Sequence, residues 1–383
     1  MTEAEAVGRL SLESPRARAV RAQVELARAD ALVAGRLPNP SVTVSREAVA
    51  GVTEGYLLLT QSLPITGRRG LQVDSASQNV RASELRADDL LRRLRADVRR
   101  AFIELSLAEA RERELASALK SLQSLGVSLA RREAAGDAAG FDRLRAEREA
   151  LDLAADLGDA RARRGRAQGL LASFYFPPPD PATLHPAPFN PVQPPLPSGD
   201  DLVTRALSSR PDLLALERDI EAAKIAGHAA SRSRVPEPEI VAGLKTSSVD
   251  DGRQGSVLSL QASIPLFDRA QPERAQAAAR EQLALAERDA LRAEIGAVIR
   301  GLRLSAEERR NLADQYRVDA LPKSDELQRI AQVSYDAGER GILELLDAYR
   351  SAADARLRMV ELYAAAANAD IDLELATAVE IRK

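Results

Sequence analysis

The stretch YDAGERGILELLDA, at residues 335–348, is a glycine-containing turn between two long helical patterns. A stretch of the same form, EAAGDAAGFDRLRA, lies at residues 133–146. A single shift of 202 residues aligns the two stretches, so that Gly136 falls on Gly338. The other pairs matched at this shift are Asp142 with Glu344, Leu144 with Leu346, and Ala146 with Ala348. Recurrence over about half of the chain indicates an internal duplication.

Two glycines mark each of the repeated turns. The first tip turn is predicted at Gly136 and Gly140, and the second at Gly338 and Gly341. Helical patterns of several turns lead into and out of both. Each tip turn should therefore reverse the chain between two long antiparallel helices.

The first repeat is predicted to contain three helices and one strand pair. Apolar residues three and four apart indicate the helices, and short runs of β-branched and apolar residues indicate the strands. The predicted elements are helix 15–35, strands 41–46 and 56–63 around an extended loop at 51–55, helix 68–134 and helix 141–173. Prolines mark the boundaries of the strand pair, namely Pro38, Pro40 and Pro64.

The second repeat is predicted to follow the same plan. Its elements are helix 211–234, strands 239–244 and 256–264 around a turn at 250–252, helix 272–337 and helix 342–378. The boundary prolines are Pro236, Pro238 and Pro265. Pro322 lies inside the long helical pattern, where it should kink or locally unwind the helix at a cost of about 3 kcal/mol.

A proline-rich segment separates the repeats. Ten prolines lie between residues 174 and 198, which predicts an extended, non-helical connection. Such a composition is also typical of a disordered linker, but a position between two repeats favours an ordered strap. We therefore divide the chain into a first repeat at 1–174, a strap at 175–199 and a second repeat at 200–383.

The composition excludes several classes of protein. The chain has 54 basic and 57 acidic residues, so its net charge of −3 gives no general attraction to nucleic acid. Cysteine is absent, which excludes disulfides, thiol catalysis and a lipid-bearing cysteine. No apolar run approaches the roughly 18 residues of a membrane-spanning helix. Residues 1–5 are acidic and do not resemble a signal peptide, so we expect the true start to lie upstream or the signal to have been removed.

The predicted strands would leave unpaired edges. A lone hairpin is only marginally stable and an open sheet exposes backbone groups, so closure should require other copies of the chain. Three copies of four strands would give an even-numbered barrel of the bacterial outer-membrane kind. The fold class predicted is therefore mainly α with short β-hairpins: a duplicated unit of helix, strand pair and long helical hairpin.

Four motifs on this duplicated frame carry a resemblance to a known family. They are LPNP at 37–40, LPITGRR at 63–69, IPLFDR at 264–269 and the two glycine tips. With these motifs in order, the chain resembles the TolC-type outer-membrane efflux proteins, particularly their heavy-metal cation branch. The resemblance implies a homotrimer with a β-barrel in the outer membrane and an α-helical tube in the periplasm. It also implies an exit duct that works with an RND-type inner-membrane pump and a periplasmic adaptor.

The resemblance further implies a periplasmic gate at the second tip. Tyr335, Arg340 and Asp347 match the family positions whose hydrogen bonds and ion pairs hold the entrance closed. Glu344 and Asp347 lie three residues apart on one helix face, so Arg340 could reach either, or the same face of a neighbouring chain. The alternative interpretation is that all four are solvated polar residues beside a turn. Arg340 would supply the bidentate geometry that such a latch needs.

No residue constellation indicates catalysis, a cofactor or a dedicated metal site. The only histidines, His185 and His228, have no second histidine at ligand spacing and are expected to be ordinary surface or packing residues. The strands offer Tyr56 as the one obvious membrane-interface aromatic. Two other non-enzyme functions were weighed, a soluble coiled-coil scaffold and a periplasmic adaptor. A scaffold does not explain strand pairs that recur at the same place in each repeat, and a need for detergent would separate a membrane duct from a scaffold. Adaptors have one helical hairpin flanked by several β-rich modules, whereas helices dominate this sequence.

Overall fold

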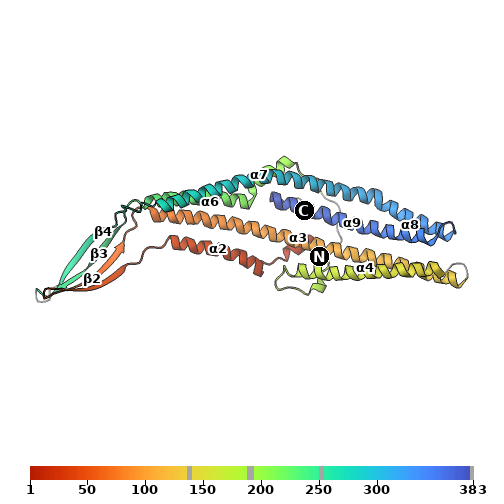
Figure 1. Cartoon of the computed structure of the whole chain (residues 1–383), viewed down its shortest axis with the longest axis horizontal. Coiled ribbons are helices and arrows are strands. Elements are labelled where there is room, and N and C mark those ends of the chain that lie inside the picture. Colours follow the sequence, from red (N-terminus) through yellow and green to blue (C-terminus); the bar gives the residue numbers. More distant parts are fainter. Residues whose placement is uncertain (136–139, 188–193, 250–253, 380–383) are drawn as a thin grey trace. The chain divides into compact units, whose positions relative to one another are not determined.

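The computed structural model describes residues 1–135, 140–187, 194–249 and 254–379, and it consists of long helices and one four-stranded sheet (Figure 1). The chain divides into two units. Unit 1 contains Met1–Ala19, Leu90–Arg210 and Glu294–Lys383, and unit 2 contains Val20–Asp89 and Pro211–Ala293. Three helices contribute residues to both units, namely α2 (Pro15–Ala34), α3 (Arg68–Ala134) and α7 (Gln271–Gln315).

Unit 2 contains the sheet and the helices that lead to it. Its four strands are antiparallel and lie in the order β1-β2-β3-β4. Their bounds are β1 Ser41–Val49, β2 Val52–Ser62, β3 Pro238–Ser247 and β4 Gln254–Ala262. Helices α2 (Pro15–Ala34) and α6 (Pro211–Arg232) precede the two strand pairs. The strand pairs from the two repeats thus form one sheet, as the duplicated pattern predicts.

The first hairpin differs from the prediction. The extended loop predicted at 51–55 is wrong, because residues 52–55 pair with β1, and Val52 lies opposite Val49. A two-residue turn, Ala50 and Gly51, joins the strands, and both residues have positive φ, 50° and 83°. That backbone suits the right-handed twist of a tight hairpin. The turn predicted for the second hairpin at 250–252 lies outside the described residues.

The boundary prolines lie at the ends of the strands. Pro38 and Pro40 precede β1, Pro64 follows β2, Pro236 precedes β3 and Pro265 follows β4. Pro238 is the first residue of β3, where a missing N–H costs no ladder bond, and its carbonyl accepts the Leu63 N–H at 2.9 Å.

The two faces of the sheet differ in chemistry. Residues directly opposite each other in antiparallel strands point to the same face, and the register aligns Val42, Leu59, Ala242 and Leu258 in one row. This face is exposed and apolar in its central rows, which also contain Val44, Leu57, Leu244, Ile240 and Leu260. The opposite face contains Thr43, Ser45, Glu54, Tyr56, Lys245 and Ser259, with three apolar residues, Leu58, Val241 and Val257, among them. The sheet therefore has one apolar and one largely polar face.

Tyr56 lies on the polar face of the sheet, and its role at a membrane interface stays a prediction. Its hydroxyl donates to Glu54 Oε2 at 2.5 Å, and the Lys245 ammonium lies 5.3 Å from its ring centroid. The alternation of side chains along β2 places it opposite to Leu57.

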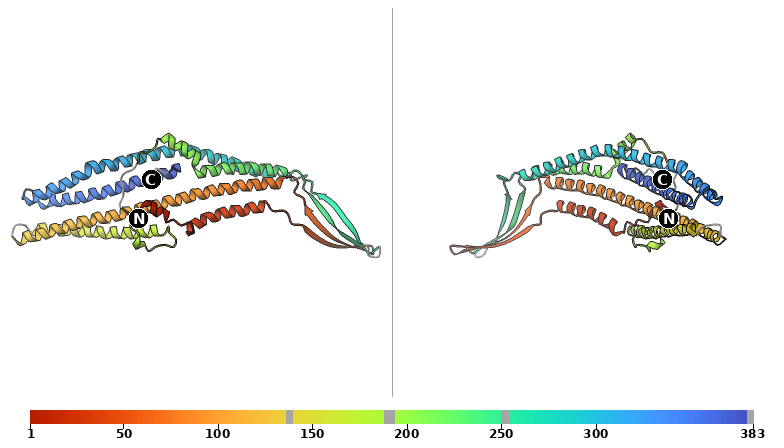
Figure 2. Two further views of the ribbon diagram at one scale, coloured as in Figure 1. Left: turned by 180° about the vertical axis from the view of Figure 1, so that it is seen from behind. Right: turned by 45° about the vertical axis from the view of Figure 1, so that its right-hand side comes forward.

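Unit 1 contains the helical hairpins of both repeats. The first repeat contributes α1 (Glu3–Gly8), most of α3, and α4 (Gly140–Ala172). The second contributes α5 (Gly199–Ser209), part of α7, α8 (Leu321–Asp336) and α9 (Ile342–Thr377). Helices α8 and α9 run side by side in both views of Figure 2. The sequence patterns did not indicate α1 or α5, which are short and lie beside the proline-rich segment and the N-terminus.

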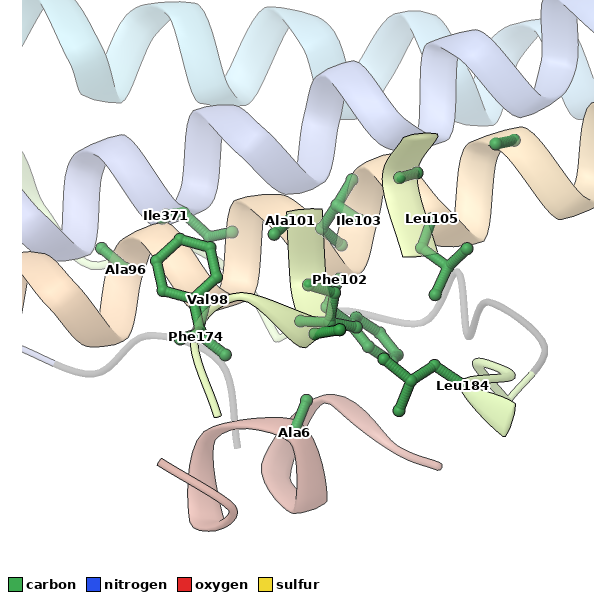
Figure 3. Close-up of a cluster of buried hydrophobic side chains, with 14 of the residues drawn as sticks. Ala6, Ala96, Val98, Ala101, Phe102, Ile103, Leu105, Phe174, Leu184 and Ile371 are labelled. Carbon is green, nitrogen blue, oxygen red and sulfur yellow. The ribbon is translucent and has the colours of Figure 1, made fainter. Parts of the chain in front are cut away.

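Part of the strap packs into the core of unit 1. Leu184, which follows the short 3-10 helix η1 (Pro181–Thr183), is 1% exposed and contacts a cluster that includes Phe102, Phe174 and Ile371 (Figure 3). The side-chain amide of Gln168 donates to the Leu184 carbonyl at 3.1 Å. Residues 188–193 lie outside the described part, so the strap as a whole stays a prediction.

The interruption predicted at Pro322 is confirmed. Helix α7 ends at Gln315, a π-helical turn η2 covers Tyr316–Ala320, and α8 begins at Leu321. A π-helical turn accommodates the proline because its ring blocks the ordinary backbone hydrogen bond. Its counterpart α3 has no proline and is continuous over 67 residues.

Candidate functional site

The tips of the two helical hairpins in unit 1 share a buried apolar cluster. Side chains come from α3, α4, α8 and α9, so the cluster joins both repeats. Its members are Leu122, Leu125, Leu129, Ala146, Ala331, Tyr335, Ile342, Leu345 and Leu346. The helices on either side of the two tip turns are thus held to a common core.

The second tip turn is a Schellman motif. Gly338 has φ of 77°, its N–H donates to the Tyr335 carbonyl, and the Glu339 N–H donates to the Ser334 carbonyl at 2.9 Å. The next helix begins after Gly341, whose N–H donates to Glu344 Oε2 at 3.0 Å. Glu344 is therefore engaged in capping α9.

We expect Gly338→Ala to destabilise unit 1, because an L residue in the left-handed region costs about 1–2 kcal/mol. A matched control is Gly126→Ala within α3, where an added Cβ has no neighbour within 4 Å. That change should stabilise the helix by about 0.5–1 kcal/mol. The midpoints of thermal unfolding should shift in opposite directions, and a Gly338→Ala midpoint at or above wild type would contradict this account.

Tyr335 links the second tip to the first. Its hydroxyl donates to Asp142 Oδ2 at 2.8 Å, and Asp142 lies in the first turn of α4. The side chain is only 7% exposed, and burial, followed by the hydrogen bond to Asp142, raises the pKa of Tyr335 to about 12. The phenol therefore stays protonated at neutral pH and remains a hydrogen-bond donor.

Two ion pairs also join the tip regions of the repeats. Arg132 of α3 lies over the Tyr335 ring, 5.4 Å from its centroid, and its Nη1 is 3.4 Å from Asp336 Oδ1. Arg350 of α9 donates to Glu149 Oε1 of α4 at 2.9 and 2.5 Å. Both ion pairs are more exposed than Tyr335, so solvent weakens them. The hydrogen bond from Tyr335 to Asp142 therefore contributes most to fixing the two hairpins relative to each other.

The structure brings together only part of the predicted gate. Three of the four predicted gate residues, Tyr335, Arg340 and Glu344, line one hollow of about 430 Å³, and Arg132, Asp142 and Phe141 also line it. Arg340 is exposed, and in the described part of the chain it contacts neither Glu344 nor Asp347. Asp347 is also exposed and lies near the charge of Arg350. The pairing of Arg340 with either carboxylate of its own chain is therefore not observed.

Of the two glycines predicted to mark the first tip turn, the structure describes only Gly140. Gly136 lies outside the described residues. Gly140 is the first residue of α4, and a Cβ there would come within 2.6 Å of Glu133 Oε1. Glu133 in turn accepts from Arg143 Nε at 2.6 Å, so a small residue at position 140 leaves room for this pair.

Asp142 is the residue of the candidate site that the sequence reasoning did not single out. The duplication aligned it with Glu344, which made it an equivalent of a predicted gate residue. Its partner was not visible, because a hydrogen bond between residues 193 apart depends on how the two hairpins pack. The alignment of Asp142 with Glu344 was the only feature of the sequence that pointed to Asp142.

The remaining candidates show no metal-binding arrangement. No group of three His, Asp or Glu side chains in the described ranges is placed to hold a metal ion. His185 Nδ1 lies 2.9 Å from Glu109 Oε1, which makes it a surface polar contact. None of the helices that the structure describes is both long and apolar enough to cross a membrane.

Part of the chain matches the model of a known protein family. Residues 202–379 match the family model described as outer membrane efflux protein. A search of curated protein sequences found no significant match. The match covers 178 of the 383 residues, which is almost all of the second repeat.

Several solved structures have the same fold over nearly the full chain. A membrane protein from Pseudomonas aeruginosa is 21% identical with a TM-score of 0.81, covering 98% of this chain and 92% of that one. The outer membrane protein VceC from Vibrio cholerae is 18% identical with a TM-score of 0.81, covering 99% and 97%. The MtrE outer membrane channel of Neisseria gonorrhoeae, in its open state, is 20% identical with a TM-score of 0.79, covering 99% and 88%.

Proposed function

We propose that the chain is the outer-membrane exit duct of a tripartite efflux system, a conduit and not an enzyme. The observation that carries the proposal is the exposed, one-sided apolar face of the sheet in unit 2. Its strands are 9 to 11 residues long, which matches the length that a tilted strand needs to span a bilayer. A soluble scaffold would have no use for an exposed apolar surface of this kind.

The oligomer we propose is a homotrimer. Strands β1 and β4 are the two edges of the sheet, and within the described residues neither has a partner on its outer side. Edges of this length invite pairing with another copy, and head-to-tail pairing of three copies closes the ring. The apolar face would then contact outer-membrane lipid and the polar face would line the pore. The helices of the three copies would extend into the periplasm.

The gate we propose combines one contact within the chain and one between chains. Tyr335 fastens its tip to Asp142 of the same chain. Arg340 is exposed beside it and carries a charge without a carboxylate partner in the part of the chain described, so we propose that it pairs with Glu344 or Asp347 of a neighbouring copy. An arginine–carboxylate pair at this position would hold adjacent tips together and keep the periplasmic end closed.

The partners we propose are a periplasmic adaptor and an RND-type inner-membrane pump, with heavy-metal cations as the cargo class. These follow from the resemblance to the heavy-metal cation branch. Cargo is tested in a strain that lacks the gene, which should become sensitive to transition-metal salts and recover when the chain is supplied. Sensitivity to organic drugs alone would replace the metal assignment with another cargo.

Fractionation and mass measurement test the duct directly. We expect the protein to appear in the outer-membrane fraction, to require detergent for extraction, and to have the mass of a trimer by light scattering in detergent. Replacing Leu57, Leu59 and Leu258 by serine should remove the protein from the membrane fraction, because the apolar face would be lost. Extraction of the wild type by salt alone, as a monomer, would support a soluble scaffold instead.

A further inference from the structure

A belt of exposed arginines and apolar side chains surrounds the end of the sheet that joins the helices of unit 2. It lies on four connecting segments, residues 36–37, 65–69, 232–235 and 264–269, which we term the junction collar. Its six arginines are Arg36, Arg69, Arg232, Arg234 and Arg269, which are exposed, and Arg68, which is half-buried. Its six large apolar residues are Leu37, Ile65, Val235, Ile264, Leu266 and Phe267, all exposed. A soluble surface seldom presents so many apolar side chains among like charges.

Backbone and side-chain contacts hold the four segments at one edge of the sheet. The register places Ser62 beside Glu239, and Pro238 beside Ala262. The Thr66 hydroxyl donates to Glu237 Oε1 at 2.7 Å, and Arg69 Nε donates to the Gly35 carbonyl at 2.8 Å. The collar is therefore a single surface made by both repeats.

The arginines of the collar are not neutralised by the protein. Across the described residues, none of the six guanidinium groups contacts a carboxylate. Exposed arginines elsewhere in unit 2 behave differently: Arg28 pairs with Glu84 and Arg292 with Glu217. The adjacent carboxylates, Glu237 and Asp268, are already engaged with Thr66 and with the Ala270 N–H. The collar therefore has an excess of positive charge in a chain whose net charge is −3.

The apolar residues of the collar continue the apolar face of the sheet. Ile264 and Phe267 lie two and five residues beyond the end of β4, whose Leu258 and Leu260 are on that face. Phe267 is 93% exposed, although an aromatic ring of this size normally gains by burial. An aromatic and aliphatic rim beside unpaired arginines is the chemistry that recognises the boundary between lipid tails and anionic headgroups.

We propose that the junction collar binds the headgroups of anionic phospholipids in the membrane leaflet nearest the helices, and so fixes the depth of the sheet in the bilayer. This inference rests on the proposed insertion of the sheet into the outer membrane. The guanidinium groups bind headgroup phosphates, while Phe267 and Leu266 lie among the first acyl carbons. Charge complementarity and continuity with the lipid-facing surface select lipid over a protein partner.

The test is a lipid titration of the full-length oligomer in neutral detergent, followed by native mass spectrometry. The lipids are phosphatidylglycerol, which is anionic, and phosphatidylcholine, which has no net charge. The collar variant is R232Q/R234Q/R269Q. The matched control is R148Q/R317Q/R329Q, which removes three exposed arginines from helices of unit 1, each paired with a carboxylate three or four residues away. Both variants change the net charge equally.

We expect the wild type and the control to retain phosphatidylglycerol in preference to phosphatidylcholine. The collar variant should bind phosphatidylglycerol at least about tenfold more weakly, since each arginine near an anionic surface is worth roughly fivefold. The conservative variant R232K/R234K/R269K should keep the preference, which separates charge from folding. Equal binding of the two lipids by the wild type, or an unchanged preference in the collar variant, would overturn the proposal.

A separate reconstitution into lipid vesicles distinguishes failure of the collar proposal from failure of the proposed outer-membrane duct. If the wild type inserts into phosphatidylcholine vesicles and shows no lipid preference, only the collar proposal falls. If it inserts into neither neutral nor anionic vesicles, the proposed function falls as well.

Discussion

Tyr335→Phe combined with Arg340→Ser is expected to raise the single-channel conductance of the oligomer in planar bilayers severalfold. Tyr335→Phe removes the buried hydrogen bond to Asp142, and a bond to a charged group contributes about 1.5–3 kcal/mol. Because each 1.4 kcal/mol is a factor of ten, this loss alone would shift the closed-to-open ratio by roughly ten- to a hundredfold. Arg340→Ser removes the proposed pair with the neighbouring copy.

The single variants separate the two contacts. Asp142→Asn should act like Tyr335→Phe, because both weaken the same hydrogen bond, and their combination should add little. Arg340→Lys keeps the charge but loses the bidentate geometry, so it should open the gate less than Arg340→Ser. A suitable control is Arg148→Gln on α4, whose side chain pairs with Asp152 of its own helix. Wild-type conductance from the double variant, with the oligomer intact, would show that these residues do not hold the gate closed.

The duplicated frame could be predicted from the sequence because it depends on local signals. Spacing of apolar residues, prolines at strand ends and glycines at turns act over a few residues, and they located α2, α3, α4 and α9 to within a few positions. The break beside Pro322 was predicted for the same reason, since a proline in a helix interior has a local steric effect. Gly55 led to the extended loop that was wrong, because a glycine within a strand imitates a turn signal.

The candidate site depended on packing between distant segments, which local patterns do not encode. Tyr335 was identified by resemblance, but its partner Asp142 lies on the other repeat. Glu344 was assigned to the gate, whereas its carboxylate caps the N-terminus of α9. A carboxylate three residues into a helix is suited to both roles, and only the position of the Gly341 N–H distinguishes them. The pairing of Arg340 stays a prediction.

Arg310 of α7 holds the end of the proline-rich strap to the helices of unit 1. Its Nε donates to Asp370 Oδ1 of α9 at 2.8 Å, and its Nη1 donates to the Pro194 carbonyl of the strap at 2.6 Å. Asp370 is completely buried and the Arg310 side chain is 13% exposed. One guanidinium thus joins two helices and the end of the strap.

We expect Asp370→Ala to destabilise unit 1 by about 3–5 kcal/mol, because it leaves the Arg310 charge buried without its carboxylate. The effect should be seen as faster hydrogen exchange in α9 and residues 194–209, a local measurement that does not require two-state unfolding of the whole chain. The double variant Arg310→Met with Asp370→Leu should recover most of the loss in α9, since it removes both charges together. The amide of Leu196 should stay labile in that variant, because the bond to Pro194 is not replaced; Pro194 and Pro195 have no N–H and give no signal.

The matched control is the pair Arg300 and Asp200, which joins α7 to α5 at 3.1 Å with side chains 58% and 87% exposed. Breaking this exposed pair by Asp200→Ala should cost less than about 1 kcal/mol, because solvent screens both charges. The same chemistry on the same helix should therefore give effects that differ severalfold according to burial. If Asp370→Ala and Asp200→Ala change hydrogen exchange equally, the buried pair does not anchor the strap, and the segment is held by the packing of Leu184 and its neighbours alone.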